Sequence, residues 1–574
     1  MKIKMQFNDV FLIIASVIAV LRLVICNLLS VDAIFFISDL LMDVFMLGAS
    51  FIFFFHKFVS RDPLRKIGFE WPLLMMFAAA GISFFYTIDQ SMTLRSSLHL
   101  FSMAAFFYAL VNALDTPLRQ QLFLWAMFFV AAVVAIFAIK DMVVYFRTPL
   151  AVERLILDTT HNNMLSYLIV HHRATSFMGW PNMLAGYLLL IVPFAGLLVF
   201  FTRPIGLRLF FAVLLGVFVG GFLFTYSFLG WFSLFLSSIV MIPFFLKNFI
   251  GAWTSRVRIS MVGIVALFFV LFFYVIAHKD FSGSIAPRII YYKNAFVLMT
   301  QKPLLGQGFG TFGLASKPMI TSLDGISDHL HNTYLQWWVE AGLLGFLGII
   351  FFLYVFLRKG YAFLRKSVIQ QEDWIAFSLL WGLLAFFIDN FLSYSFIQPN
   401  VSFYAWVMLA LFLAMIHGKE EFVGNKGRFI SAIICLNCLF AFYLTLRMCL
   451  AFTVCHQGFA SFLEGDLKGA NEALAKSSRL DPWSMKYPQI AGNMALQTYG
   501  VAERGDYLKA AEANYLEALR REPAVYVNYY VLSKIYFYLQ DQPRSDFFLH
   551  KAQQISPFEF SMDVQSEKMN RKLF

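Results

Sequence analysis

The polar stretch that organises this chain reads Pro303-Leu-Leu-Gly-Gln-Gly-Phe-Gly310, then Asp328-His-Leu-His-Asn-Thr-Tyr-Leu-Gln336, then Glu340-Ala-Gly342. A further block, Arg288-Ile-Ile-Tyr-Tyr-Lys293, precedes it. Long apolar segments lie on both sides. Arginine, lysine, glycine and histidine are therefore concentrated here, in a chain that is otherwise largely hydrocarbon. We expect the apolar segments to determine the fold and this stretch to carry the chemistry.

The composition indicates a membrane protein. The chain has 574 residues, of which 60% are hydrophobic and 14% charged, whereas a soluble domain has about 25% charged residues. Runs of about 20 apolar residues, long enough to cross a bilayer, recur along most of the chain. The first lacks a clear signal-peptide cleavage site. We predict an all-α, polytopic membrane protein of about 12–13 spans, near residues 9–29, 34–56, 71–86, 92–113, 119–146, 182–201, 207–226, 228–247, 259–277, 342–358, 374–396, 400–417 and 428–450.

The distribution of basic residues predicts the orientation of these spans. The loops after the second, sixth, eighth, tenth and twelfth predicted spans are basic, whereas loops 30–33, 87–91 and 396–399 contain neither lysine nor arginine. Positively charged loops stay in the cytoplasm, so we expect the N-terminus inside and, after thirteen spans, the C-terminus outside. Two long loops, 147–181 and 278–341, would also lie outside. The net charge of +11 follows the loops and does not indicate a nucleic-acid partner.

The segment after Leu450 has a different composition, which is polar, charged and rich in alanine. A pattern that begins at Gly465-Asp and ends at Asp481-Pro is repeated from Gly505-Asp to Glu522-Pro, with a weaker copy ending at Ser556-Pro. A period near 34 residues with a helix-turn-helix pattern resembles tetratricopeptide repeats. We predict a membrane domain at 1–450 and a helical-repeat domain at 451–574. The repeats could bind a protein partner or form a helical cap without a ligand.

The block that begins at Arg288 has helical periodicity. We expect it to lie at the outer membrane surface, with Arg288 and Lys293 pointing away from its apolar face. There a guanidinium could bind phosphate oxygens through two parallel hydrogen bonds. Arg288 could equally contact lipid headgroups in general. The expected apolar face consists of Ile289, Tyr292, Phe296 and Met299.

His329 and His331 lie just before an apolar helix start. A histidine near its usual pKa of about 6.5 can accept a proton at neutral pH. The alternatives are solvated side chains, or a zinc site with Asp328, for which a further ligand at suitable spacing is missing. Glycines 306, 308 and 310 are predicted to form a flexible turn. They do not form a nucleotide loop, because no strand precedes them and no helix with Lys-Ser/Thr follows.

Taken in order, these blocks resemble the O-antigen ligase and polymerase family of membrane glycosyltransferases. In that family a loop with R…P-L-x-G-x-G…H-x-H-N-x-Y-L…E-x-G faces the outside of the inner membrane. The resemblance covers roughly residues 70–415. It implies an inverting enzyme of the GT-C type whose donor is a glycan on undecaprenyl diphosphate, without a metal or other cofactor.

The resemblance also implies roles for individual residues. His331 would be the general base on the acceptor hydroxyl, and Arg288 would hold the donor diphosphate. Their supporting residues in the loop would be His329, Asn332, Gly306, Gly308 and Glu340.

One departure from the family pattern occurs at Thr225-Tyr-Ser-Phe-Leu-Gly230, where many members carry Ser-Arg-Gly and use that arginine for the phosphates. A diphosphate carries more negative charge than one arginine neutralises, so we expect a second cation. Arg173 is the first candidate, because it precedes Pro181-Asn182 in a block that also resembles the family. Arg95 is the second candidate, and Lys293 a further donor-binding residue.

These observations predict an enzyme of the bacterial cytoplasmic membrane that transfers lipid-linked glycans. The acceptor could be a lipid core, as in lipopolysaccharide ligation, another lipid-linked glycan, as in polymerisation, or a protein hydroxyl. A polysaccharide transporter or flippase and an inactive scaffold are alternatives of other classes; the missing arginine favours the scaffold. Among the charges within predicted spans, Arg22 and Asp39 lie at similar depth, so we expect them to pair.

Overall fold

The computed structural model describes residues 5–28, 35–147, 173–249, 282–365, 373–416, 421–422 and 424–570. These residues form helices and one short antiparallel pair of strands, β1 (Leu64–Arg65) and β2 (Glu421–Phe422). The prediction of an all-α polytopic membrane protein is therefore confirmed.

Ten spans in the described part are long and apolar enough to cross a membrane. Two shorter apolar helices, α3 (Glu70–Ser83) and α16 (Trp374–Asp389), join them. Together they coincide with every predicted span except 259–277, which lies outside the described residues. The ten are α1 (Phe7–Leu28), α2 (Phe35–Ser60), α4 (Gln90–Ala113), α5 (Pro117–Arg147), the pair α8 (Pro181–Leu189) and α9 (Val192–Phe201), α10 (Ile205–Phe224), α11 (Phe228–Phe249), α15 (Thr333–Leu364), α17 (Pro399–Ile416) and α18 (Asn425–Leu463).

Two helices extend beyond the predicted spans. Helix α15 begins at Thr333 rather than 342, because the side chain of Asn332 caps it by accepting hydrogen bonds from the backbone N–H groups of Tyr334 (3.1 Å) and Leu335 (3.0 Å). Helix α18 continues past 450, the predicted end of the last span, to Leu463, and the domain division at this position stays a prediction. No proline interrupts it, and it ends before Gly465, which has a φ of 86°.

The helices of the membrane domain pack around an aromatic core. Helix α2 lies along α18 and α4, α15 packs on α3, and α16 packs on α11 and α17. Phe352 of α15 illustrates the core, with its ring centroid 4.7 Å from that of Phe69 and 5.4 Å from that of Trp406. Such contacts between aromatic rings supply much of the packing that holds a bundle together.

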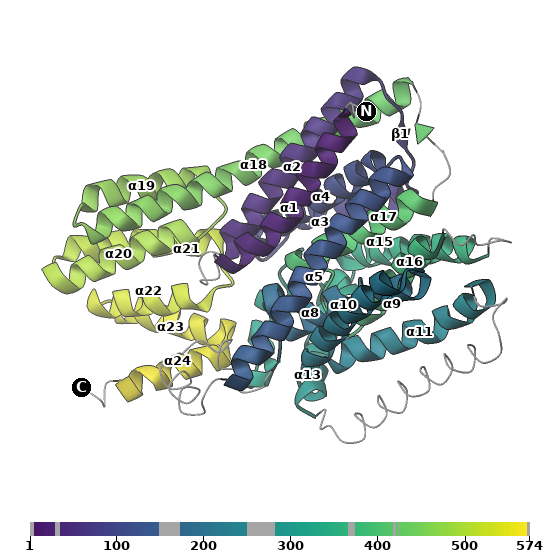
Figure 1. Cartoon of the computed structure of the whole chain (residues 1–574). Coiled ribbons are helices and arrows are strands. Elements are labelled where there is room, and N and C mark those ends of the chain that lie inside the picture. The colour runs from purple at the N-terminus through teal and green to yellow at the C-terminus, as the bar shows by residue number, and fades with distance from the viewer. Residues whose placement is uncertain are drawn as a thin grey trace.

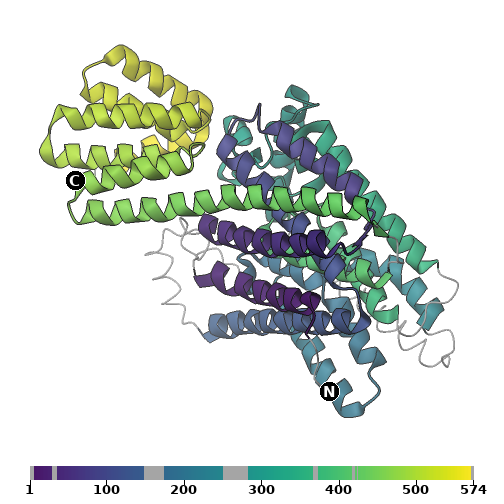
Figure 2. The same ribbon diagram turned by 90° about the horizontal axis from the view of Figure 1, so that it is seen from above.

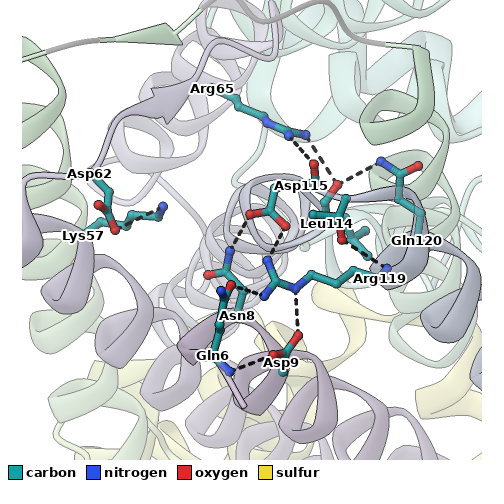
Figure 3. A network of polar contacts seen from close by, with 11 residues as sticks. Gln6, Asn8, Asp9, Lys57, Asp62, Arg65, Leu114, Asp115, Arg119 and Gln120 are labelled. Atoms are coloured by element: carbon teal, nitrogen blue, oxygen red, sulfur yellow. Dashed lines mark hydrogen bonds and ion pairs between the residues drawn. The ribbon is translucent and has the colours of Figure 1, made fainter. Parts of the chain in front are cut away.

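One end of the bundle is closed by a network of polar contacts around Arg65 and Arg119 (Figure 3). We call this the basic end. Arg119 at the start of α5 forms ion pairs with Asp9 (2.7 Å) and Asp115 (2.6 Å) and donates to the side chain of Gln6 (2.7 Å). Arg65 of β1 donates to the carbonyl of Asp115 (3.1 Å). The network ties the N-terminus to the α4–α5 connection, and the β1–β2 pairing brings the loops after α2 and α17 to the same end.

The C-terminal helices stack in chain order beside the bundle, and α18 leads into them (Figures 1 and 2). The predicted repeat copies coincide with α19, α21 and α23, two of which begin with a capping aspartate, Asp466 or Asp541. Each copy ends just before its proline. The tetratricopeptide identity stays a prediction. The helices are α19 (Leu467–Leu480), α20 (Lys486–Ala502), α21 (Gly505–Arg521), α22 (Tyr526–Tyr538), α23 (Gln542–Ile555) and α24 (Pro557–Asn570).

Candidate active site

His331 is the last loop residue but one before α15, and its backbone has a φ of 57°. This left-handed conformation is uncommon for a residue other than glycine, and such conformations gather at functional sites. The two residues that follow His331 are held in place. Asn332 caps α15, and the backbone N–H of Thr333 donates to the carbonyl oxygens of Asn390 (3.0 Å) and Ser393 (3.2 Å). The turn that follows α16 therefore fixes the position of the histidine.

Aromatic side chains surround the two histidines. The Tyr394 ring stacks on His329, with centroids 4.3 Å apart, and meets His331 edge-on at 4.7 Å. Tyr291 of α13 (Ser282–Gln301) lies nearly parallel to the His331 ring at 5.5 Å. The imidazole of His331 is therefore packed between two aromatic rings. Tyr394 was missed in the sequence, although the polar run Asp389-Asn390 to Ser393-Tyr394-Ser395 inside an apolar segment was a signal for it.

His329 is tied to the helix that follows it. The amide nitrogen of Gln336 lies 3.2 Å from Nδ1 of His329 and also donates to Oε1 of Glu340 (2.9 Å). An amide N–H can only donate, so Nδ1 of His329 accepts. Burial lowers the pKa of His329, while the charge of Asp328 opposes this change. His329 is therefore neutral at neutral pH and linked to Glu340 through one side chain.

The glycine-rich block is tightly packed, and the expectation of a flexible turn was wrong. Glycines 306, 308 and 310 all have positive φ values, of 75°, 121° and 83°. Their backbone pairs with the kink of α15 at Gly342: the N–H of Gly308 donates to the carbonyl of Glu340 (2.9 Å). The Glu340 carboxylate in turn accepts from the N–H groups of Gly310 (2.9 Å) and Phe312 (3.2 Å). A Cβ at Gly306 would collide with the backbone of Glu340.

Arg288 and Arg173 lie in this same region. Arg288 is half-buried on α13, and burial lowers its pKa, with the charges of Tyr292, Tyr291 and Asp389 opposing this change and that of Arg173 adding to it. Burial, then the positive charge of Arg288 and a smaller contribution from His329, lower the pKa of His331 to about 3. The two guanidinium groups and the imidazole are thus close enough to act on one another electrostatically.

Arg173 connects two segments that correspond to blocks of the family pattern. Its Nε donates to the carbonyl oxygen of Thr225 (2.7 Å) and its Nη2 to the side chain of Asn182 (2.8 Å). Thr225 begins the segment in which the family pattern has its Ser-Arg-Gly arginine. A guanidinium from another loop therefore lies beside that segment.

The helices behind these residues pack closely through small residues. A Cβ at Gly186 of α8 would lie 2.6 Å from Oγ of Ser395, and one at Gly230 of α11 would lie 2.9 Å from Cβ of Ala185. Ser395 donates to Asp389 (3.3 Å) at the end of α16. The Pro-Asn block, the segment after Thr225 and the turn after α16 thus meet around Arg173 and Asp389.

Two further predicted donor-binding residues, Lys293 and Arg95, have different surroundings. Lys293 is exposed on the face of α13 that also exposes Ile289 and Phe296, so its predicted separation from that apolar face was wrong. Residues 288 and 293 are five positions apart, which separates them by about 140° around a helix. Arg95 forms an ion pair with Asp481 of the C-terminal domain (3.1 Å).

Some of the charges within the predicted spans form local pairs. The predicted pair of Arg22 and Asp39 is confirmed, with a distance of 2.7 Å. Asp43 lies 2.9 Å from Nδ1 of His99 and accepts from Ser102. These contacts join α1, α2 and α4.

The helical bundle, the charged loop and the histidine between aromatic rings define a polytopic membrane protein with a candidate transfer site at the end opposite the basic end. Residues 182–350 match the family model described as O-Antigen ligase (Wzy_C), which supports the resemblance to the O-antigen ligase family. The match includes Arg288, His331 and Glu340, and indicates glycan transfer of the O-antigen ligase type from a lipid-linked glycan to an acceptor. No curated protein matches the chain.

Proposed function

We propose that this protein transfers a glycan from undecaprenyl diphosphate to an acceptor hydroxyl at the outer face of the bacterial cytoplasmic membrane. The observation that carries the proposal is the grouping of Arg288, Arg173 and His331. An imidazole between aromatic rings, with two guanidinium groups nearby, suits a reaction with a hydroxyl nucleophile and a diphosphate leaving group. The alternation of basic loops supports an orientation with the N-terminus in the cytoplasm and the C-terminal domain outside.

In the proposed reaction His331 accepts the proton of the acceptor hydroxyl. The hydroxyl oxygen forms a bond to the anomeric carbon while the bond from that carbon to the diphosphate oxygen breaks, and the configuration inverts. Undecaprenyl diphosphate leaves with the electron pair of the broken bond. Arg288 and Arg173 stabilise the charge that develops on its phosphate oxygens, for which a guanidinium offers two parallel donors.

The protonation state of His331 suits this role before the donor binds. With its lowered pKa, the imidazole is neutral at pH 7 and can accept a proton. A bound diphosphate would place negative charge beside Arg288 and His331, which raises the pKa of the histidine. The donor would thus strengthen the base at the moment of reaction.

The acceptor is a lipid core in the ligase version of this proposal. Polymerisation of lipid-linked glycans, or transfer to a protein hydroxyl, would use the same residues. A C-terminal helical domain next to the loop is compatible with a protein acceptor or another protein partner. Assays with the three acceptor types separate these versions.

The test is glycan transfer by purified protein from a synthetic undecaprenyl-diphosphate donor. We expect His331→Ala to lower the rate by about 10²–10⁴-fold without loss of folded protein. His456→Ala is the matched control, because His456 is exposed on α18. Wild-type transfer by His331→Ala would contradict the assignment of the base, and no transfer by the wild type to any acceptor would favour a transporter or scaffold.

The orientation has its own test. In intact cells or spheroplasts carrying a cysteine-free background, an impermeant thiol reagent should label His331→Cys and leave Tyr361→Cys unlabelled. The opposite result would invert the orientation.

A further inference from the structure

We propose that the C-terminal helical domain positions the His331 loop, and that Lys317 and Glu559 are the pair through which it does so. The inference deepens the proposed function, because it assigns the C-terminal domain a part in the same site. The domain would then contribute to the rate of the reaction, whether or not it also binds a partner.

The contact between the two regions is a partly buried ion pair. Nζ of Lys317 lies 2.9 Å from Oε2 and 3.3 Å from Oε1 of Glu559, and the side chains are 24% and 20% exposed. Ser556 donates to Oε2 of Glu559 (2.9 Å), which fixes the carboxylate. The ring of Tyr526 lies 5.8 Å from Nζ and adds a cation–π contact. Side chains of helices α22 and α24 thus bind one lysine of the loop.

A short path leads from Lys317 to His331. Lys317 directly follows α14 (Phe312–Ser316). The glycine of that helix, Gly313, lies so close to the Asp328 backbone that a Cβ there would be 2.9 Å from Cα of Asp328. Phe312 is buried in one cluster with Leu330. A displacement of α14 would therefore shift residues 328–330, which immediately precede His331.

A second contact holds the same domain close to the glycine block. Arg95 of α4 pairs with Asp481 (3.1 Å), whose side chain is fully buried. Asp89, which caps α4, and Glu522 are buried as well, and burial, then the charge of Asp89, raises the pKa of Glu522. Two residues before Asp89, Thr87 lies against Gly308, where a Cβ would collide with it. The domain is therefore anchored near both ends of the segment that contains Gly308 and His331.

The test uses charge reversal at the first contact. Because a misplaced catalytic group can cost up to about 10²-fold in rate, we expect Glu559→Lys and Lys317→Glu each to lower kcat by about 10- to 100-fold, with the donor KM changed by less than about twofold. The double variant should recover most of the loss, because it restores the pair with opposite polarity. Reversal of the exposed pair Arg504 and Asp506, 67% and 58% exposed, is the matched control and should leave kcat unchanged.

A second readout does not depend on activity. Amide hydrogen exchange in residues 327–332, measured without substrate, should accelerate in each single variant and return toward the wild-type rate in the double variant. Wild-type exchange and kcat in the single variants would overturn the inference. So would a double variant as impaired as the single ones, because the loss would then come from something other than the pair. If the wild type transfers no glycan, the exchange measurement alone decides the inference.

Discussion

The two ends of the bundle use arginine in opposite ways. At the basic end, Arg119 lies between two carboxylates, those of Asp9 and Asp115 (Figure 3). At the other end, burial lowers the pKa of both Arg288 and His331, and the charge of Arg173 on Arg288 and that of Arg288 on His331 add to this change. In the first arrangement the positive charge is paired within the protein, so it stabilises the fold without a bound ligand. The second gathers positive charge, which is the pattern expected of a site that binds an anion.

Arginine substitutions at the two ends of the bundle should have the largest and most different effects. We expect Arg288→Ala and Arg173→Ala each to lower glycan transfer by about 10²–10³-fold, because each removes a donor that stabilises developing phosphate charge. Arg173→Lys should recover only part of the loss, since lysine keeps the charge without the planar fork. Arg119→Ala should lower the thermal unfolding temperature and leave the kcat of the folded fraction unchanged. Steady-state kinetics and thermal unfolding of the four purified variants check these outcomes.

A smaller effect is expected from the aromatic ring that holds the two histidines. Tyr394→Leu removes the ring contacts at 4.3 and 4.7 Å but leaves an apolar side chain. We expect kcat to fall by about tenfold, since the imidazole loses its fixed orientation without losing its chemistry. Tyr394→Phe should keep most of the rate. Equal losses in both variants would show that the hydroxyl, and not the ring, is needed.

The smallest effect concerns pH. An unperturbed histidine would give kcat/KM an acid limb near pH 6.5, whereas the lowered pKa of His331 removes that limb between pH 5 and 8 in the free enzyme. The lowered pKa of His331 also makes the stability of the fold depend on pH. The unfolded chain binds the proton below about pH 6.5 and the folded one does not, so His331 destabilises the fold as the pH falls. An acid limb near pH 6.5 that disappears in His331→Gln would contradict the lowered pKa.

Much of the fold could be predicted because apolar runs of spanning length are a strong signal, as at α5 and α17. The candidate residues Arg288, His331 and Arg173 could be predicted from local blocks, and the structure brings them together. Tyr394 could not be found as easily, because its turn was absorbed into the predicted span 374–396. Its role depends on a contact with a histidine more than 60 residues earlier in the chain.

Other features have no local signal at all. The face of Lys293 was misjudged because α13 is apolar on two sides: Tyr291 and Leu298 pack inward, while Ile289 and Phe296 are exposed. The predicted end of α18 rested on the end of its apolar run, whereas a helix can continue through polar residues. The pair of Lys317 and Glu559 joins residues 242 positions apart, and only the three-dimensional packing brings them into contact.

The most direct test of the central claim, that Arg173 and Arg288 form a diphosphate site, is equilibrium binding of undecaprenyl diphosphate without a glycan. The protein is purified in lipid nanodiscs and the dissociation constant is measured for the wild type and for Arg173→Ala, Arg288→Ala and Arg119→Ala. We expect the first two variants to bind at least about tenfold more weakly, equivalent to about 1.4 kcal/mol, and Arg119→Ala to bind as the wild type does. Unchanged binding in both Arg173→Ala and Arg288→Ala would contradict the claim.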